Sequence, residues 1–290
     1  MSVLPFDQRE GFIWMNGRLL PWSEAHLHVL SHGLHYGSCV FEGERTYGGK
    51  VFKSREHTER FKNSANILDF EIPYSVEEIE AAKKLVVEKN GLSSCYVRPV
   101  AWRGSEMMAV AAQNSTINVA IAVWDWPSMF DVNDKMRGIR LDIAEYRRPD
   151  PRCAPVHAKA AGLYMICTLS KHRAERRGYA DAMMLDWEGR VAECTGANIF
   201  FAKDGVLHTP LADCFLDGIT RRTVIDLAKA RGVEVHQRRI MPEELTSFDE
   251  CFICGTGAEV TPVSEVGSYK FTPGNLSRTL IEDYTTAVNA

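Results

Sequence analysis

Two short segments contain the residue types that chemistry on an amino group requires. His157-Ala-Lys-Ala-Ala-Gly-Leu-Tyr164 presents Lys159 with a tyrosine five residues later, and Glu193-Cys-Thr-Gly-Ala-Asn198 adds a carboxylate. A lysine with a depressed pKa can bind an aldehyde as an imine, exchange it for an incoming amine and carry a proton. A carboxylate facing a pyridine nitrogen keeps that nitrogen protonated, so that the ring can accept electrons. Together these residues predict a site for pyridoxal 5′-phosphate.

Two further stretches are suited to binding a phosphate. Gly218, Ile219 and Thr220 open a stretch of helical apolar periodicity that runs to Arg231. The unpaired amides and the dipole of a helix N-terminus attract anions. Cys254-Gly-Thr-Gly-Ala-Glu-Val-Thr-Pro262 is a glycine-threonine turn after an apolar strand. Either turn alone is weak evidence, so its weight depends on the other motifs.

These motifs, in this order, resemble those of the branched-chain amino acid aminotransferases, pyridoxal-phosphate enzymes of fold type IV, over residues 12 to 262. The resemblance implies that Lys159 is the catalytic lysine, that Tyr164 hydrogen-bonds the cofactor's 3′-oxygen and that Thr256 touches the phosphate. Arg55 would clamp the same phosphate, a task that suits a planar guanidinium. The cofactor-binding residues implied are Arg55, Lys159, Tyr164, Glu193, Gly196, Asn198, Gly218, Ile219, Thr220 and Thr256.

The substrate side of the resemblance lies mainly in the N-terminal part. Residues 28–45 match the family almost continuously, and Tyr96 and Arg98 are two apart on one strand, hence on one face. The pocket must accept both a branched aliphatic side chain and the γ-carboxylate of glutamate, and Arg98 and Tyr36 would bind that carboxylate. The substrate-binding residues implied are Tyr36, Phe41, Gly43, Arg45, Tyr96, Arg98, Trp126, Gly257 and Ala258.

Two positions depart from the family pattern. Where relatives often have a tyrosine in an interdomain gate after Trp126, this chain reads Pro127-Ser-Met129-Phe130, so one polar contact to glutamate is missing from the pattern. Glu44 lies where an apolar residue is common, and its alternation with Gly43 and Arg45 predicts a surface charge. A solvated helix face is expected for the neighbours of Arg55, namely Lys53, Glu56, His57, Glu59 and Arg60.

Composition agrees with a soluble enzyme that has room for two domains, but it does not identify one. The chain has 290 residues, 45% hydrophobic and 25% charged. A net charge of −4 offers no basic footprint for nucleic acid, and no apolar stretch reaches the roughly 18 residues of a membrane span. Asp7, Arg9 and Glu10 interrupt any signal-peptide core, so a cytoplasmic location is expected.

The cysteines are spread through apolar and strand-like segments rather than spaced as a disulfide framework. They are expected to be buried thiols: Cys39, Cys95, Cys153, Cys167, Cys194, Cys214, Cys251 and Cys254. Cys251 and Cys254 have redox or zinc spacing, but no second pair accompanies them. No metal site is therefore predicted.

The expected elements favour an α+β fold. Ser75-Val-Glu-Glu78 is a capping box opening a helix that ends near Asn90, and residues 117–126 alternate as a strand. The second half mixes helices over 160–177 and 219–231 with hairpins at 186–189 and 204–205. Without regular β-α-β alternation, this mixture argues against a dinucleotide fold. The expected division is a smaller N-terminal α+β domain (1–128), a linker (129–137) and a larger C-terminal α+β domain carrying the lysine (138–290), as in the D-amino acid aminotransferase-like proteins.

The resemblance implies transamination between leucine, isoleucine or valine and 2-oxoglutarate, in two half reactions through pyridoxamine phosphate. It also implies a homodimer or larger homo-oligomer, because a neighbouring chain completes the family pocket with the loop 104–113. Alternatives within the fold are an amine or D-amino acid transaminase and a 4-amino-4-deoxychorismate lyase, which Arg45 and Arg98 together disfavour. A cofactor-free binding protein of the same fold is a different class of alternative, and it would lack the yellow imine absorbance.

Overall fold

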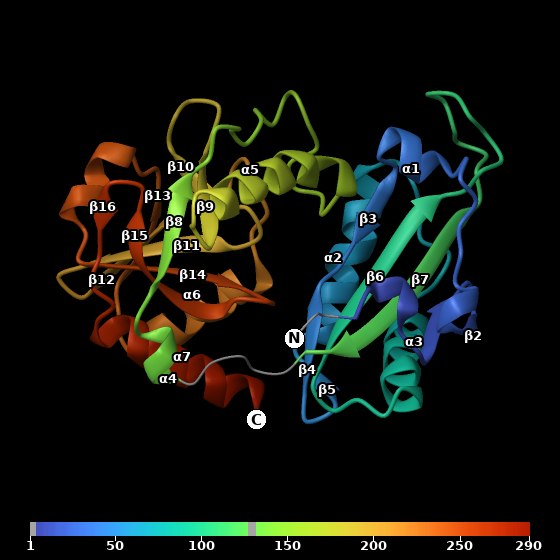
Figure 1. Ribbon diagram of the computed structural model, residues 1–290, viewed down its shortest axis with the longest axis horizontal. Coiled ribbons are helices and arrows are strands. Elements are labelled where there is room, and N and C mark those ends of the chain that lie inside the picture. The colour runs from blue at the N-terminus through green and yellow to red at the C-terminus, as the bar shows by residue number, and fades with distance from the viewer. Residues whose placement is uncertain (1–3, 127–131) are drawn as a thin grey trace. The chain divides into compact units, whose positions relative to one another are not determined.

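The computed structural model describes residues 4–126 and 132–290, which form two compact units (Figure 1). Unit 1 is Met1–Pro127 with Ala158–Gly162, and unit 2 is Ser128–His157 with Leu163–Ala290. Of the predicted linker, residues 129–131 lie outside the described residues, and α4 (Val132–Lys135) follows them. The predicted domain limits remain a proposal. One difference is that Lys159, assigned from the sequence to the C-terminal domain, groups by its contacts with unit 1.

Unit 1 is built on a seven-stranded sheet within the described residues, in the order β2-β1-β7-β6-β4-β5, with β3 also paired to β6. Its centre is the long antiparallel pair of β6 and β7, in register from Cys95↔Asp125 to Arg103↔Ile117. The strands are β1 (Phe12–Met15), β2 (Arg18–Pro21), β3 (Cys39–Phe41), β4 (Glu44–Tyr47), β5 (Lys50–Val51), β6 (Cys95–Arg103) and β7 (Ile117–Asp125).

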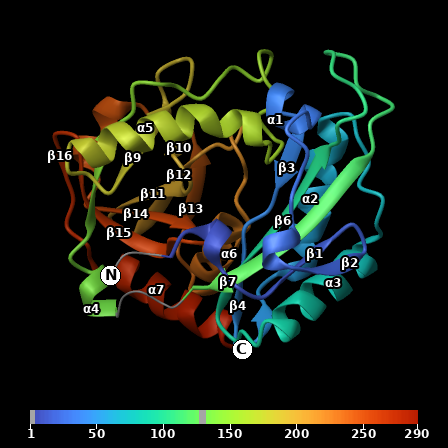
Figure 2. The same ribbon diagram turned by 45° about the vertical axis from the view of Figure 1, so that its right-hand side comes forward.

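Helices α2 (Ser54–Ile67) and α3 (Val76–Lys89) pack on each other and against the sheet of unit 1, α2 on β3 and α3 on β1 and β7 (Figure 2). The predicted capping box opens α3: Ser75 Oγ accepts a hydrogen bond from Glu78 N (3.1 Å), and Glu78 Oε2 accepts one from Ser75 N (2.7 Å). Phe61 and Ile79 on the helices and Val97 on β6 are fully buried. The remaining helical turns are η1 (Phe6–Gln8), η2 (Trp22–Glu24) and α1 (His32–Tyr36).

Unit 2 is built on a nine-stranded sheet within the described residues, in the order β10-β9-β8-β15-β14-β11-β12-β13, with β16 paired to β15. Most pairs are antiparallel, but β8 runs parallel to β9 and β15, and β12 parallel to β13. The strands are β8 (Ile139–Ile143), β9 (Asp181–Leu185), β10 (Val191–Cys194), β11 (Asn198–Lys203), β12 (Val206–Pro210), β13 (Val235–Arg238), β14 (Glu250–Gly255), β15 (Glu259–Val266) and β16 (Tyr269–Lys270).

Helices cover both faces of this second sheet. α5 (Met165–Arg176) packs on β8 and β9, whereas α6 (Ile219–Ala230) and α7 (Asn275–Val288) pack on each other and on β14 and β15 (Figures 1 and 2). Short 3-10 helices are η3 (Ala161–Tyr164) and η4 (Pro242–Ser247). Buried aromatic rings stack in the core, Phe201 on Phe248 at 5.0 Å and Phe200 on Phe252 at 5.0 Å. These contacts give the strands that carry Glu193 and Asn198 a packed support.

Most predicted elements of the second half are confirmed. The two hairpins join β9 to β10 and β11 to β12, and the helix at 219–231 is α6. The last helix begins at Asn275, where Glu250 accepts hydrogen bonds from the amides of Leu276 (3.2 Å) and Ser277 (2.8 Å) of its first turn. No helix in the described ranges has the length and apolar character needed to span a membrane.

Candidate active site

Lys159 lies on a segment whose backbone is joined to β3. Its amide donates to Ser64 Oγ on α2 (3.0 Å), its carbonyl accepts from the Phe41 amide (3.1 Å), and the adjacent Ala160 forms a β-bridge with Val40. Its Nζ lies 5.0 Å from the centroid of the Phe41 ring. Backbone bonds therefore fix the position of Lys159 independently of what its side chain binds.

The predicted substrate residues of β3 and β4 come together around Tyr96. A Cβ added to Gly43 would lie 2.0 Å from the Tyr96 hydroxyl oxygen, so a side chain at this position would displace the tyrosine. Arg45 pairs in register with Tyr96, and its Nη2 donates to the Trp126 carbonyl (3.3 Å). The Tyr96 ring lies 5.2 Å from that of Trp126. Arg45 is buried, which excludes an ordinary charge on the strand surface.

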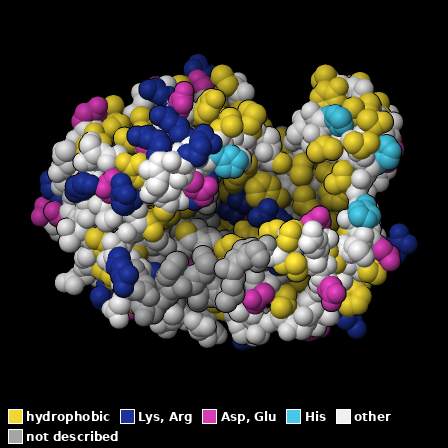
Figure 3. Space-filling model, in the orientation of Figure 1, with side chains coloured by type: hydrophobic (Ala, Val, Ile, Leu, Met, Phe, Trp, Pro, Cys, Tyr) yellow, Lys and Arg dark blue, Asp and Glu magenta, His cyan; other side chains and the backbone are white. Residues whose placement is uncertain are grey.

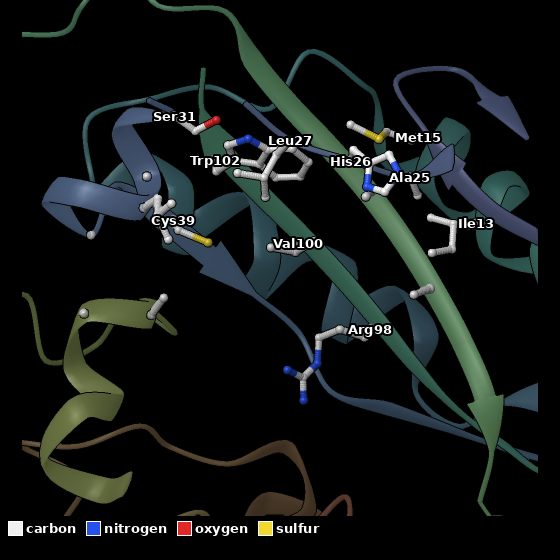
Figure 4. Close-up of a pocket in the computed structure, with 17 residues that line it drawn as sticks. Ile13, Met15, Ala25, His26, Leu27, Ser31, Cys39, Arg98, Val100 and Trp102 are labelled. Atoms are coloured by element: carbon white, nitrogen blue, oxygen red, sulfur yellow. The ribbon is translucent and has the colours of Figure 1, made fainter. Parts of the chain in front are cut away.

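Arg98 lies at one end of an apolar cavity of about 550 Å³ within unit 1 (Figure 4). Its guanidinium carbon is 4.8 Å from the centroid of the Phe41 ring and 5.3 Å from that of Tyr96. Within the described ranges no Asp or Glu forms an ion pair with Arg98, and its buried Nε has no hydrogen-bond partner. Aromatic rings thus stabilise this cation without neutralising it, which leaves it able to bind an acid.

Tyr36 is held by a histidine that sequence reasoning did not single out. The Tyr36 ring stacks on that of His32 at 4.5 Å and 22°. His32 is buried, and its ring nitrogens hydrogen-bond to Ser38 Oγ (3.0 Å) and to the Ala109 carbonyl (2.8 Å). His32 therefore connects Tyr36 to the loop 104–113. It is one of three histidines between residues 28 and 35, and spacing alone does not distinguish it from the others.

Arg55 is exposed at the start of α2. It forms ion pairs with Glu59 (3.0 Å) and Glu77 (3.3 Å), and its side chain is 61% exposed. Surface pairs of this kind contribute little, so a phosphate could replace either carboxylate. Its assignment to the cofactor phosphate remains a prediction.

In unit 2, Glu193 on β10 is bound to Arg148, which the sequence did not identify. The Arg148 Nε lies 3.3 Å from Glu193 Oε1, and both side chains are largely buried. Burial disfavours the charge of Arg148, but Glu193 outweighs it and raises the pKa of the guanidinium. Asn198 Nδ2 also donates to Glu193 Oε2 (3.4 Å). A neighbouring cation and a donated hydrogen bond favour the ionised form of a carboxylate, which is the form that a pyridinium nitrogen requires.

The predicted phosphate elements meet at Asn198. The side-chain Nδ2 of Asn198 donates to the Leu216 carbonyl (3.1 Å). A Cβ added to Gly218 would lie 2.2 Å from the Oδ1 of Asn198. Gly218 is the N-cap of α6, whose first residues Ile219 and Thr220 are buried. A helix N-terminus in this setting offers unpaired amides to an anion.

The turn of Thr256, Gly257 and Ala258 joins β14 to β15 beside the same strand, because Asn198 pairs in register with Cys254. A Cβ added to Gly255 would lie 3.3 Å from the Gly196 carbonyl. The turn that contains Gly196, the turn of residues 256–258 and the start of α6 at Gly218 therefore lie next to one another in unit 2. This arrangement fits a phosphorylated cofactor whose ring nitrogen is served by Glu193.

Several surface predictions were wrong. Glu44 is fully buried and bound to Lys83 (2.7 Å), because strand alternation turns it toward α3 rather than toward solvent. His57 and Arg60 are not on a solvated face, because they bind the buried Glu42 at 2.7 Å each. The gate residues 127–130 lie outside the described residues.

Two of the eight cysteines differ from the expectation of buried thiols. Cys153 is exposed and Cys39 is half-buried, while the other six are buried. Burial raises the pKa of both Cys251 and Cys254, which lie within β14. Within the described ranges, no group of three or more His, Cys, Asp and Glu side chains is placed to hold a metal ion.

Known proteins resemble this chain in both sequence and fold. The family model "Amino-transferase class IV" matches residues 39–266. A "probable branched-chain-amino-acid aminotransferase" of Rickettsia bellii is 44% identical over 278 residues, 94% of each chain. A T.th. branched-chain amino acid aminotransferase with pyridoxamine 5′-phosphate has a TM-score of 0.94 at 40% identity, covering 97% of this chain and 95% of its own. The complex of that T.th. enzyme with N-(5′-phosphopyridoxyl)-L-glutamate has a TM-score of 0.92 at 41% identity, with the same coverage.

These matches confirm the predicted resemblance, the fold type IV architecture, the aminotransferase class and the dependence on pyridoxal phosphate. The chain belongs to the amino-transferase class IV family.

Proposed function

We propose that the protein transfers the amino group between L-leucine, L-isoleucine or L-valine and 2-oxoglutarate. The observation that carries this proposal is the position of Arg98 beside the rings of Phe41 and Tyr96, without a carboxylate partner in the described ranges, while the Nζ of Lys159 lies 5.0 Å from the same Phe41 ring. Such a site suits two kinds of acid, one with an aliphatic side chain and one with a second carboxylate. The names of the relatives and the glutamate adduct of the T.th. enzyme support the same substrates.

Pyridoxal phosphate, when bound, supplies a ring that accepts electrons from the amino acid's α carbon. In this proposal Lys159 binds the cofactor and moves the α proton, while Glu193 holds a proton on the ring nitrogen and Arg148 keeps Glu193 ionised. Tyr164 hydrogen-bonds the 3′-oxygen. The phosphate is assigned to the turn with Gly196 and Asn198, the residues Gly218, Ile219 and Thr220, Thr256 and Arg55.

The substrate groups are assigned by their charge. The backbone amides of Gly257 and Ala258 would bind the α-carboxylate, and Arg98 with Tyr36 would bind the γ-carboxylate of glutamate. Guanidinium bonds to carboxylates are stronger than neutral hydrogen bonds, which makes this contact decisive for the dicarboxylate. The side-chain pocket that both kinds of donor share is assigned to Phe41, Gly43, Arg45, Tyr96 and Trp126.

Single half reactions with a panel of amino donors of both hands test the proposal. The yellow holoenzyme should lose its imine absorbance with L-leucine, L-isoleucine, L-valine and L-glutamate, and regain it with 2-oxoglutarate. Conversion of D-amino acids or simple amines in preference to these donors would overturn it and favour the other transaminases of the fold. A purified protein that binds no cofactor would instead indicate a binding protein.

The proposal includes a homo-oligomer of at least two chains in the cytoplasm. Exposed apolar side chains gather around α1, among them Leu34 (63% exposed) and Val29 (67%), and Val110 (85%) lies on the loop 104–113 (Figure 3). Exposed apolar surface of this extent is typical of a protein interface. Sedimentation of the holoenzyme should give at least a dimer, whereas a monomer at micromolar concentration would remove the shared pocket from the proposal.

A further inference from the structure

Two buried acids flank Gly43, and each is tied to a different helix behind the sheet. Glu42 binds Arg60 (2.7 Å) and His57 (2.7 Å) of α2, and Glu44 binds Lys83 (2.7 Å) of α3. Both glutamate side chains are 0% exposed. Buried charges of this kind are costly unless they are well paired, so their presence in one short segment calls for a physical account.

The two acids differ in how completely they are paired. Both oxygens of Glu42 accept hydrogen bonds from Arg60, and His57 adds a third. Glu44 uses only Oε2, because its buried Oε1 has no hydrogen-bond partner in the described ranges. Burial raises the pKa of Glu44 to about 8 although Lys83 opposes this shift. Glu44 thus makes one directed hydrogen bond, to Lys83, whereas both oxygens of Glu42 are hydrogen-bonded.

The Nζ of Lys83 has hydrogen-bond acceptors other than Glu44. Its Nζ also donates to Thr58 Oγ1 (2.6 Å), Glu80 Oε1 (3.1 Å) and the Ser54 carbonyl (3.2 Å). These partners fix Lys83 between α2 and α3. A strand bonded to Lys83 is therefore held relative to both helices.

The opposite side of the same strand segment carries the proposed substrate residues. Side chains alternate along a strand, and Gly43 and Arg45 lie beside Tyr96 while Glu44 faces α3. β4 is joined to β6 through only two pairs in register, Glu44↔Val97 and Arg45↔Tyr96. The Cys95 amide also donates to Thr46 Oγ1 (2.7 Å), which holds the Thr46 end of β4 to β6, so the bond from Glu44 to Lys83 acts on the other end of the strand.

We propose that Glu44 and Lys83 are positioning residues. They hold β4 so that Gly43 and Arg45 keep Tyr96, whose hydroxyl accepts a hydrogen bond from Arg98 (3.5 Å), in the geometry that a dicarboxylate needs. The inference rests on the proposed transamination. A guanidinium bond to a carboxylate depends steeply on direction, whereas contacts with a branched aliphatic chain tolerate small shifts. The bond between Glu44 and Lys83 therefore favours glutamate over leucine without touching either substrate.

The test compares Glu44→Leu, which removes the bond to Lys83, with Glu44→Gln, which keeps an acceptor for it. Lys83 retains Glu80 and Thr58 in both variants, so both are expected to fold. In single half reactions of the holoenzyme, Glu44→Leu should lower kcat/KM for glutamate about tenfold, through KM, and that for leucine less than about threefold. Glu44→Gln should restore the ratio. Lys84→Met is the matched control, because Lys84 is the next residue of α3 and its side chain is 78% exposed.

Hydrogen exchange gives a measurement that does not require turnover. The amides of residues 44–47 should exchange faster in Glu44→Leu than in wild type or Glu44→Gln, while the amides of α5 stay unchanged. Equal losses of kcat/KM for glutamate and leucine, or unchanged amide exchange in β4, would overturn the positioning role. The Glu44 side chain would then contribute only packing volume between β4 and α3. If the wild-type enzyme converts neither donor, the transamination proposal fails, and the exchange measurement alone then decides whether Glu44 holds the strand.

Discussion

The two units treat buried charge differently. In unit 2 the buried Arg148 and Arg221 have carboxylate partners, at 3.3 Å from Glu193 and 2.6 Å from Asp217, although the Nε of Arg148 makes no hydrogen bond among the described residues. In unit 1 Arg98 faces aromatic rings with no acid partner in the described ranges, and Glu44 leaves one oxygen without a hydrogen bond. The desolvation of a charge must be offset by a partner or by a change of protonation.

The contrast indicates what each unit does with its charges. In the proposed function, the pairing of Glu193 with Arg148 in unit 2 serves a cofactor nitrogen that needs an ionised acceptor. In the same proposal, the unbalanced cation Arg98 of unit 1 would take up the charge of an incoming acid, so that its pairing would be completed when substrate binds. Glu42 serves as a reference for Glu44, because it is a buried acid of unit 1 whose two carboxylate oxygens are both hydrogen-bonded.

The largest expected effect comes from removing the reactive amine from this arrangement. Lys159→Ala should lower turnover by at least about 100- to 10,000-fold, the range of lost acid-base catalysis alone, with the fold intact. The fold is retained because the bonds to Ser64 and Phe41 come from the Lys159 backbone. Half-reaction kinetics measure the loss of turnover, and circular dichroism measures whether the fold is retained. Lys203→Ala, at an exposed position, is the control, and a Lys159→Ala enzyme with more than a few per cent of wild-type rate would exclude the assigned role.

Breaking the balance in unit 2 should have the next largest effect. Glu193→Gln replaces an ionised acceptor by a neutral amide, so the half reaction should slow by roughly 10- to 150-fold, the range that one charged hydrogen bond gives. Arg148 would lose its buried partner, and urea unfolding should show a stability loss of about 1–3 kcal/mol. Glu175→Gln changes an exposed helical pair and is the control. Unchanged kinetics would remove Glu193 from the reaction.

Sequence reasoning predicted the fold and the motifs well, because these depend on local patterns. The capping box at Ser75, the hairpins at 186–189 and 204–205 and the start of α6 at Gly218 are each set by residues next to one another in the chain. The assembly of Asn198 with Gly218 follows from a long match to a family rather than from spacing. Local chemistry and resemblance together therefore locate the candidate residues.

What the sequence did not predict are the buried charges. Glu44 and Lys83 are 39 residues apart, and Arg148 lies in the segment after β8 whereas Glu193 lies on β10. No local pattern pairs such residues, and a lone charge on a strand or helix is ordinarily exposed. Arg147, beside Arg148, does bond at the surface to the Trp187 carbonyl (3.4 Å). The missed contacts are those that only tertiary packing brings together.

Removing the unbalanced cation of unit 1 should affect the two amino donors unequally. Arg98→Met keeps the volume and removes the unbalanced cation, so kcat/KM for glutamate should fall roughly 10- to 150-fold and that for leucine much less. Arg221→Met is the contrasting variant, because it removes a balanced cation of unit 2 and should lower stability without changing the ratio of donors. Equal losses for the two donors in Arg98→Met would assign Arg98 to the shared α-carboxylate or to the structure, and Arg45 would be the next candidate for dual recognition.

The smallest expected effect concerns stability and pH. Burial raises the pKa of Glu44 from its ordinary 4.5 to about 8, with Glu42 and Glu80 acting in the same direction and Lys83 against it. The folded protein therefore binds this proton more tightly than the unfolded chain. The stabilisation that results is fully present below about pH 4.5 and is lost as the pH rises through about 8.

Urea unfolding of wild type and Glu44→Gln at about pH 5 and about pH 9 isolates this contribution, because all other titrating groups are common to the two proteins. The variant should gain stability relative to wild type as the pH rises, since its amide never acquires the charge that burial penalises. Glu42→Gln should show the opposite trend. Arg60 and His57 outweigh burial and hold the pKa of Glu42 below its ordinary value, so that the advantage of wild type over this variant is lost as the pH falls. If Glu44→Gln and wild type had parallel pH profiles, Lys83 would be neutralising Glu44 as fully as Arg60 and His57 neutralise Glu42. The unbalanced charge of unit 1 would then be confined to Arg98.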